Sequence, residues 1–152
     1  MAKSFVEDID KGYQAFKKEI ERAKNTYVKV GVMEAAGDYD AISVAEVAAI
    51  NEYGTENNPE RPFMRNAYQR NFDKLRFMVD KKYDDFLMAR VSLFDALTAV
   101  GMFLQGEIQR EIVNLKRPPN SPRTIELKGS SNPLIDSGQL RQSITYEIEE
   151  MR

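Results

Sequence analysis

The chain has 152 residues, of which 42% are apolar and 30% are charged, and its net charge is -2. This length and apolar content are typical of one folded domain and exclude wholesale disorder, and a near-neutral charge argues against a dedicated nucleic-acid binder. The sequence has no cysteine and no histidine, which excludes disulfides and thiolate zinc sites and removes the commonest general base.

We therefore expect a protein that is not an enzyme and that holds no metal and no cofactor. The sequence contains no phosphate-binding glycine motif of the usual kinds. It also has no run of about 20 apolar residues that could span a membrane. Its first residues lack the apolar run of a signal peptide, so we expect a protein that is made in a cytoplasm.

The beginning of the chain predicts a long helix followed by a strand. Over residues 4–24 apolar side chains recur at intervals of three and four, and Ser4 and Glu7 have the spacing of a capping box. Residues 26–33 are rich in β-branched side chains and alternate in polarity, which indicates a strand, and residues 34–41 indicate a loop. The apolar stripe of the helix consists of Phe5, Ile9, Tyr13, Phe16 and Ile20.

A short helix is predicted over residues 44–53. Ser43 and Glu46 have capping-box spacing at its start, and Gly54 is the residue expected in a left-handed cap at its end. A polar loop punctuated by two prolines follows.

Two amphipathic segments then occupy a long stretch without proline. We expect helices over residues 64–90 and 92–115 with a break near 89–92, where Ser92 can cap the second helix. If collinear they would span ~75 Å, which is too long for one domain of this size, so a hairpin or an arm is favoured. Their aromatic stripe is interpreted mainly as core, with part of it packed on a neighbouring subunit.

The last third predicts a long loop and a final strand. Residues 116–134 are rich in proline, serine and asparagine, so we expect a long mobile loop with a short helical turn near 121–127. A strand over 142–149 can pair with 26–33. These elements predict a single mostly helical α+β domain over 1–152, in which a small antiparallel sheet packs against long helices.

The sequence contains clusters of acidic residues and a group of basic residues, and both could have a function. The acidic groups are interpreted as solvated faces, although a magnesium site or an acid/base pair is the functional alternative. Basic residues in the long loop could contact DNA phosphates or an acidic partner, or could simply keep the loop soluble. These basic residues are Lys116, Arg117, Arg123 and Lys128.

The sequence contains three motifs in a fixed order. They lie within residues 44–67, 96–129 and 132–148. The first contains Glu52, Tyr53, Gly54, Arg61, Pro62, Phe63 and Arg65. The second contains Gly101, Ile108, Gln109, Pro118, Pro119, Thr124, Lys128 and Gly129. The third contains Pro133, Leu134, Ile135, Asp136, Ser137, Gly138, Leu140, Ser143 and Ile144. In this order and at these spacings the chain resembles the tail-completion, or head–tail joining, proteins of tailed bacteriophages.

The resemblance implies a structural virion protein that completes the tail or neck so that it joins the filled head. Its partners would be the other neck, connector and tail-terminator proteins and further copies of itself in a ring, although the free protein could be monomeric. It would work in the virion after assembly in the host cytoplasm, near the genomic DNA. The alternative is a DNA-contacting module that acts in genome packaging or ejection, and a weaker one is a carboxylate-dependent hydrolase.

Two groups of residues are assigned from these patterns. The expected protein contacts are Glu52, Tyr53, Arg61, Phe63, Arg65, Arg117, Arg123 and Lys128. The expected architectural residues are Gly54, Pro62, Pro118, Pro119, Pro133, Asp136 and Gly138, because proline and glycine restrict or free the backbone and aspartate can cap a turn.

Overall fold

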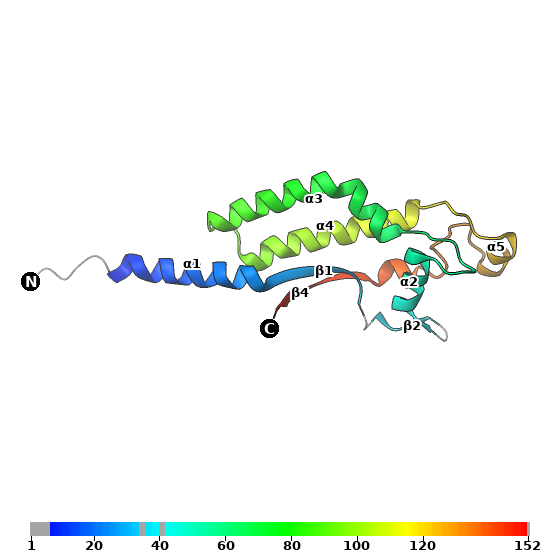
Figure 1. Ribbon diagram of the computed structural model, residues 1–152, viewed down its shortest axis with the longest axis horizontal. Helices are drawn as coiled ribbons and strands as arrows, with labels where there is room; N and C mark the ends of the chain where they lie inside the picture. The colour runs from blue at the N-terminus through cyan, green and yellow to red at the C-terminus, as the bar shows by residue number, and fades with distance from the viewer. Residues whose placement is uncertain (1–6, 34–35, 40–41, 152) are drawn as a thin grey trace, which may run out of the picture.

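The computed structural model describes residues 7–33, 36–39 and 42–151. Their fold is the predicted mostly helical α+β arrangement, in which a small antiparallel sheet packs against helices. Figure 1 shows an elongated molecule with a helical hairpin above the sheet. The expected cap at Ser4 lies outside the described residues, as does part of the expected loop over 34–41.

The sheet joins the beginning of the chain to its end. Helix α1 (Glu7–Asn25) leads directly into β1 (Thr26–Val32), which pairs antiparallel with β4 (Ile144–Glu150). Val28 stands opposite Ile148 in this register. The pairing predicted between the two alternating segments is confirmed.

The capping box of the short helix is confirmed as well. Helix α2 (Val44–Tyr53) begins after Ser43, whose hydroxyl accepts the Glu46 N–H at 3.1 Å while its own N–H donates to the Glu46 carboxylate at 2.8 Å. The bond from the Ser43 backbone N–H, and a second from the Ser43 hydroxyl to the carboxylate at 3.0 Å, lower the pKa of Glu46. Before it, β2 (Asp38–Tyr39) and β3 (Ile42–Ser43) form a short hairpin where a loop was expected.

Gly54 ends α2 in a conformation different from the expected one. Its φ is 70° but its ψ is 175°, so it does not adopt the left-handed helical cap. The chain turns sharply here, and a Cβ on Gly54 would lie 2.9 Å from the backbone nitrogen of Glu60. Glycine is required because the φ is positive and because the backbone of the following loop approaches so closely.

The two long helices form the predicted hairpin. Helix α3 (Phe63–Leu87) and helix α4 (Leu93–Asn114) are separated by a short turn, and Ser92 caps α4 by accepting the Asp95 N–H at 3.0 Å. Two short helices, α5 (Pro122–Lys128) and α6 (Gln139–Gln142), lie between α4 and β4.

The best-buried part of the core lies at the end of the molecule away from α1. Four side chains there are almost fully buried: Val44, Phe63, Ile112 and Ile144. They come from α2, the start of α3, the end of α4 and the start of β4. This end therefore depends on contacts between segments that are distant in the sequence.

The aromatic stripe of α3 is mostly not core, which corrects the expectation. Phe86 is buried and lies 6.2 Å from the ring of Phe16 on α1. Of the other large apolar side chains of the stripe, Leu75 is partly buried and four are exposed to solvent, because α4 covers only one side of α3. The exposed residues are Tyr68, Phe72, Val79 and Tyr83.

At Gly101, α4 approaches the sheet closely. A Cβ on Gly101 would lie 2.7 Å from the ring of Tyr146 on β4. We expect Gly101→Ala to lower the free energy of unfolding by about 1–2 kcal/mol, because overpacking outweighs the gain in helix propensity. Gly106, on the same helix, has nothing within 4 Å of an added Cβ. Gly106→Ala should instead stabilise the protein by about 0.5–1 kcal/mol. Urea unfolding of both variants checks this, and a stabilised Gly101→Ala would contradict the packing.

Candidate functional site

Most residues of the three motifs lie at one end of the molecule, whereas Gly101 of the second motif lies midway along it, against the sheet. Figure 1 shows α2, the start of α3, the end of α4 and α5 gathered there, opposite the free end of α1. We refer to the two segments that cross this end, residues 54–62 and 116–138, as the motif loops.

Arg61 holds the two motif loops together. Its side chain is buried, with 6% of its surface exposed. The guanidinium donates from Nε to the carbonyl oxygen of Pro118 at 2.9 Å, and from Nη2 to the carbonyl of Pro119 at 3.3 Å and to Oδ1 of Asn120 at 3.2 Å. Burial lowers the pKa of Arg61. The Arg117–Pro118 peptide bond, beside these contacts, is cis.

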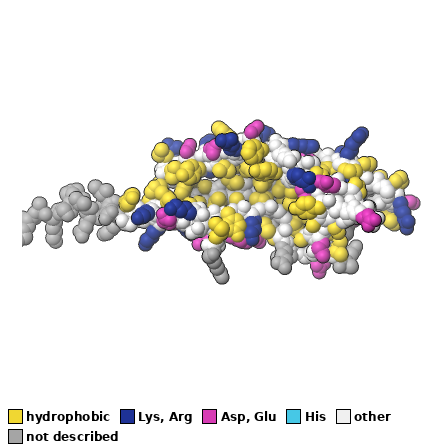
Figure 2. Space-filling model, in the orientation of Figure 1, with side chains coloured by type: hydrophobic (Ala, Val, Ile, Leu, Met, Phe, Trp, Pro, Cys, Tyr) yellow, Lys and Arg dark blue, Asp and Glu magenta, His cyan; other side chains and the backbone are white. Residues whose placement is uncertain are grey.

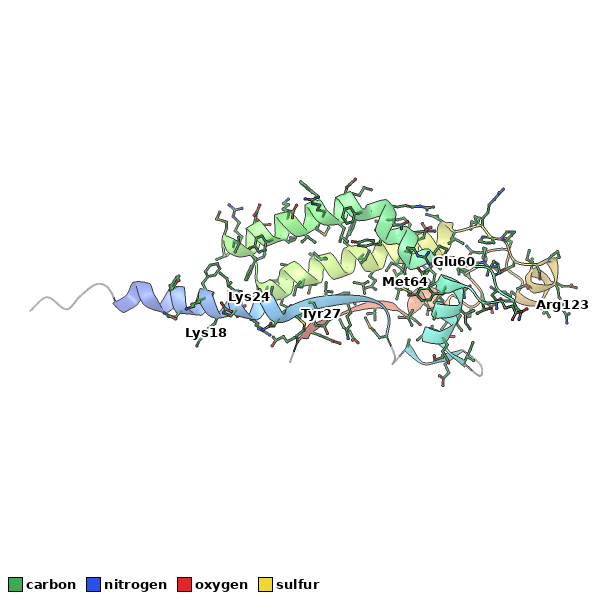
Figure 3. The ribbon with its side chains drawn as sticks, viewed as in Figure 1. Lys18, Lys24, Tyr27, Glu60, Met64 and Arg123 are labelled. Atoms are coloured by element: carbon green, nitrogen blue, oxygen red, sulfur yellow. The ribbon has the colours of Figure 1, made fainter. Side chains whose placement is uncertain are left out.

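Glu52 holds the start of α3. The carboxylate is buried and accepts the backbone N–H groups of Met64 at 2.9 Å and Arg65 at 3.0 Å. These are first-turn N–H groups that have no partner within the helix, so a side chain from α2 replaces the missing cap at Pro62. Figure 3 shows Glu60 and Met64 close together near the start of α3.

Arg65 completes the junction from the surface. Its guanidinium forms an ion pair with Glu60 at 2.6 Å and donates to the carbonyl oxygen of Glu52 at 3.3 Å. It therefore links α2, the first motif loop and α3.

Two buried polar residues that were not predicted stabilise the second motif loop and the helical hairpin. Asn132 donates from Nδ2 to the carbonyl of Val113 at 2.9 Å and accepts the N–H of Leu134 at Oδ1 at 2.9 Å. Glu111 on α4 is the second buried polar residue, and its carboxylate accepts a hydrogen bond from Arg70 of α3 at 2.6 Å. The asparagine–proline pair at 132–133 is a turn signal that could have pointed to Asn132, whereas nothing local distinguishes Glu111.

The structure divides the expected contact residues into two groups. Glu52, Arg61 and Phe63 are buried within the protomer, so the expectation that they contact a partner directly is corrected. Tyr53 lies on the surface with 74% of its area exposed, and Arg117 and Arg123 are also exposed. Figure 3 places Arg123 on α5 at the tip of the molecule.

The exposure of Lys128 is intermediate between that of the buried and the exposed contact residues. It is partly buried and donates to the carbonyl oxygen of Pro133 at 3.3 Å. Burial lowers its pKa, nearby Asp136 opposes that effect, and Arg61 adds to it. Its ammonium group thus helps to hold the second motif loop in place.

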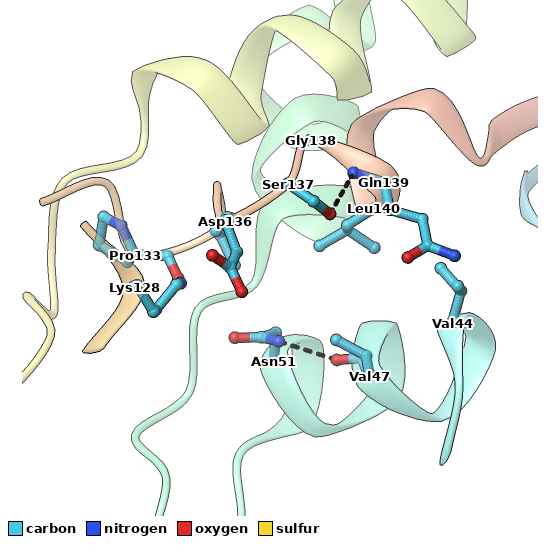
Figure 4. Close-up of a pocket in the computed structure, with 11 residues that line it drawn as sticks. Val44, Val47, Asn51, Lys128, Pro133, Asp136, Ser137, Gly138, Gln139 and Leu140 are labelled. Carbon is cyan, nitrogen blue, oxygen red and sulfur yellow. Dashed lines mark hydrogen bonds between the residues drawn. The ribbon is translucent and has the colours of Figure 1, made fainter. Parts of the chain in front are cut away.

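A small cleft of about 210 Å³ lies beside Lys128, between α2 and residues 133–140. Figure 4 shows Val44 and Val47 of α2 facing Leu140 across it, with Asp136 and Ser137 at its polar side. Ser137 accepts the Gln139 N–H at 3.3 Å, which makes Ser137 the residue that steadies the turn before α6. Gly138 adopts the left-handed conformation at that turn.

Across residues 7–33, 36–39 and 42–151, no group of three or more acidic side chains gathers in a way that could hold a metal ion. None of the helices in that part of the chain combines the length and the apolarity needed to cross a membrane.

Comparisons with protein-family models, with curated proteins and with solved structures found no match.

Proposed function

We propose that this protein is a structural component of the head–tail junction of a tailed bacteriophage, which completes the tail or neck so that it joins the filled head. The motifs that resemble tail-completion proteins support the proposal, and two of their residues, Glu52 and Arg61, form buried hydrogen bonds at one end of the molecule. Several copies would sit around the axial channel, because a ring closes contacts between different surfaces of one chain.

The main observation in support of the proposal is that Arg61, in the first motif loop, is hydrogen-bonded to the second motif loop. A guanidinium that binds two carbonyl oxygens and an amide oxygen holds both loops in one fixed shape. Loops that are fixed in this way present a preformed surface, and preformed surfaces lose less entropy on binding. Such a surface suits an assembly protein that must recognise neighbours of defined shape.

The exposed residues on that surface indicate the chemistry of the neighbour. Tyr53, Arg117 and Arg123 lie at the motif end and are exposed. Tyrosine and arginine are enriched among residues that dominate binding at protein interfaces, and the two arginines favour an acidic partner surface.

Electron microscopy of lysates tests the proposed function. In a phage that carries this gene, we expect its deletion to leave filled heads and finished tails lying separate. Complementation with the Arg117→Glu/Arg123→Glu double variant should restore far fewer joined particles than complementation with the unaltered gene. The Lys74→Glu/Arg76→Glu variant, altered at exposed basic residues of α3 that form no ion pair among the described residues, is the control.

Two other outcomes would overturn the proposal. Complete, normal particles in the deletion strain would remove the joining role. Empty heads would favour the DNA-contacting alternative, in which the protein acts during packaging.

A further inference from the structure

The main sheet consists of β1 and β4 alone, so each strand has one edge without a partner strand in the described part of the chain. The N–H of Met151 donates to the carbonyl oxygen of Asn25 at 2.7 Å, and bonded pairs alternate with non-bonded pairs along an antiparallel ladder. The odd-numbered residues of both strands therefore bond across the sheet, and the even-numbered residues direct their backbone N–H and C=O groups outward. In the middle of the strands the outward groups belong to Val28, Val30, Tyr146 and Ile148.

These two edges are open. Among residues 7–33, 36–39 and 42–151, the outward backbone groups of those four residues form no backbone hydrogen bond. An apolar groove of about 300 Å³ borders Thr26 and Val28 of β1, and a second cavity of about 470 Å³ borders Ile148 and Glu150 of β4. Figure 2 shows hydrophobic side chains gathered over the region of α3 and α4, whose residues line the other side of the groove. Because unpaired edges are templates for a strand of another chain, both are candidate interaction sites.

The two strands differ in charge on the side of the sheet that faces away from α4. The ring of Tyr146 lies against α4, so the odd-numbered residues of the strands lie on the opposite side. There β1 carries Lys29, and β4 carries Glu147 and Glu149. Lys29 forms an ion pair with Glu149 of its own chain at 2.7 Å. Glu147 is exposed and takes part in no ion pair with a described residue, so its carboxylate is available to a cation from another chain.

These charges distinguish the antiparallel pairings that two copies could form through their outward groups. If Val28 and Val30 bonded to the same residues of another β1, Lys29 would lie opposite a second Lys29. The corresponding pairing of β4 with β4 would place Glu147 opposite a second Glu147. Pairing β1 with β4 instead places Lys29 opposite Glu147, which is also the register within the protomer. Like charges directly opposite each other destabilise a ladder and opposite charges stabilise it, so the pairing of β1 with β4 is favoured.

We propose that β1 of one copy pairs antiparallel with β4 of a second copy, so that Lys29 of the first lies opposite Glu147 of the second. The added ladder gives partners to the outward groups of both strands. The contact joins two different edges, so it can repeat from copy to copy and close a ring that leaves no edge open. The inference deepens the proposed function, on which it rests for the expectation that copies meet.

Disulfide trapping tests this pairing, and the chain is suited to it because it has no cysteine. Tyr27 is opposite Glu149 in the protomer, and the same register between copies places Tyr27 of one opposite Glu149 of the next. One full-length preparation carries Tyr27→Cys and another carries Glu149→Cys, and the two are mixed and oxidised. Each chain then has a single cysteine, so every disulfide joins two copies.

The control mixture pairs Glu149→Cys with Phe77→Cys, because Phe77 is 71% exposed and lies on α3. We expect about tenfold more mixed dimer with Tyr27→Cys than with Phe77→Cys, because strand pairing raises the effective concentration of one thiol at the other. Equal yields with the two variants at the highest soluble concentration would overturn the proposal.

A charge swap tests the contact between Lys29 and Glu147 and leaves both cysteines in place. Adding Glu147→Lys to the Glu149→Cys chain places two lysines opposite each other, and we expect the yield of mixed dimer to fall about fivefold. Adding Lys29→Glu to the Tyr27→Cys chain as well should restore the yield. The restored mixture is a matched control, since it contains the same Glu147→Lys chain with any effect on its own folding. A yield that does not change with either substitution would overturn the proposed register.

The test separates this proposal from the proposed function. Separate heads and tails in the deletion strain, together with no selective cross-link, would leave the junction role standing and remove this interface. A selective cross-link with normal particles in the deletion strain would do the reverse.

Discussion

Replacing Arg61 with methionine is expected to lower the free energy of unfolding by about 3 kcal/mol or more. The side chain is buried, and its guanidinium donates three hydrogen bonds to the second motif loop. Methionine fills similar space but leaves two carbonyl oxygens and one amide oxygen without their donor. Hydrogen bonds from a charged group contribute about 1.5–3 kcal/mol each, and they are not fully additive when they share one side chain.

Urea unfolding measures this loss, and limited proteolysis locates it. Because Arg61 is the link between the motif loops, Arg61→Met should make residues 116–121 easier to cleave than in the unaltered protein. Arg123→Met, the same change at an exposed site, should alter stability by no more than about 0.5 kcal/mol. If the two variants unfolded at the same urea concentration, the Arg61 contacts would have no structural importance.

Replacing Glu52 with alanine is expected to destabilise the protein by about 2–4 kcal/mol. The buried carboxylate caps α3 through the N–H groups of Met64 and Arg65, and its negative charge lies at the positive end of the helix dipole. Alanine removes both acceptors and leaves a small cavity at the junction of α2 and α3. A charged cap in a partly buried site stabilises a helix more than a charged cap that is exposed to solvent.

Two related variants make this prediction specific. Glu52→Gln keeps one acceptor oxygen and nearly the same volume, so its loss should be smaller than that of Glu52→Ala. Glu60→Ala removes an exposed partner of Arg65 and should cost no more than about 1 kcal/mol, because exposed ion pairs are weak. A Glu52→Ala variant as stable as Glu60→Ala would show that the cap is dispensable.

These two residues change how the motifs are understood. Glu52 and Arg61 lie in the segment that resembles tail-completion proteins, and both act inside the protomer. The motif therefore describes how one end of the molecule is built, and the residues available to a neighbour are others, such as Tyr53.

Much of the fold could be predicted from the sequence because it depends on local patterns. Ser43 with Glu46 and Ser92 with Asp95 begin helices through bonds within one turn. The alternation in 26–33 and 142–149 indicates strands wherever they lie, and two strands in one small domain have few partners other than each other.

The candidate site depended on the tertiary structure, since its bonds join residues that are far apart in the chain. Arg61 meets Pro118 across 57 residues, and Arg70 meets Glu111 across 41. No local pattern shows that an arginine in a polar loop will be buried. Periodicity likewise identified the apolar flank of α3 but could not show what covers it. The sequence by itself determined the long helices, the two strands of the main sheet and the caps at Ser43 and Ser92, because those follow from neighbouring residues. Only the packing of α4 and of Phe16 from α1 against α3 decided that Phe86 is buried while Tyr68 and Phe72 are exposed.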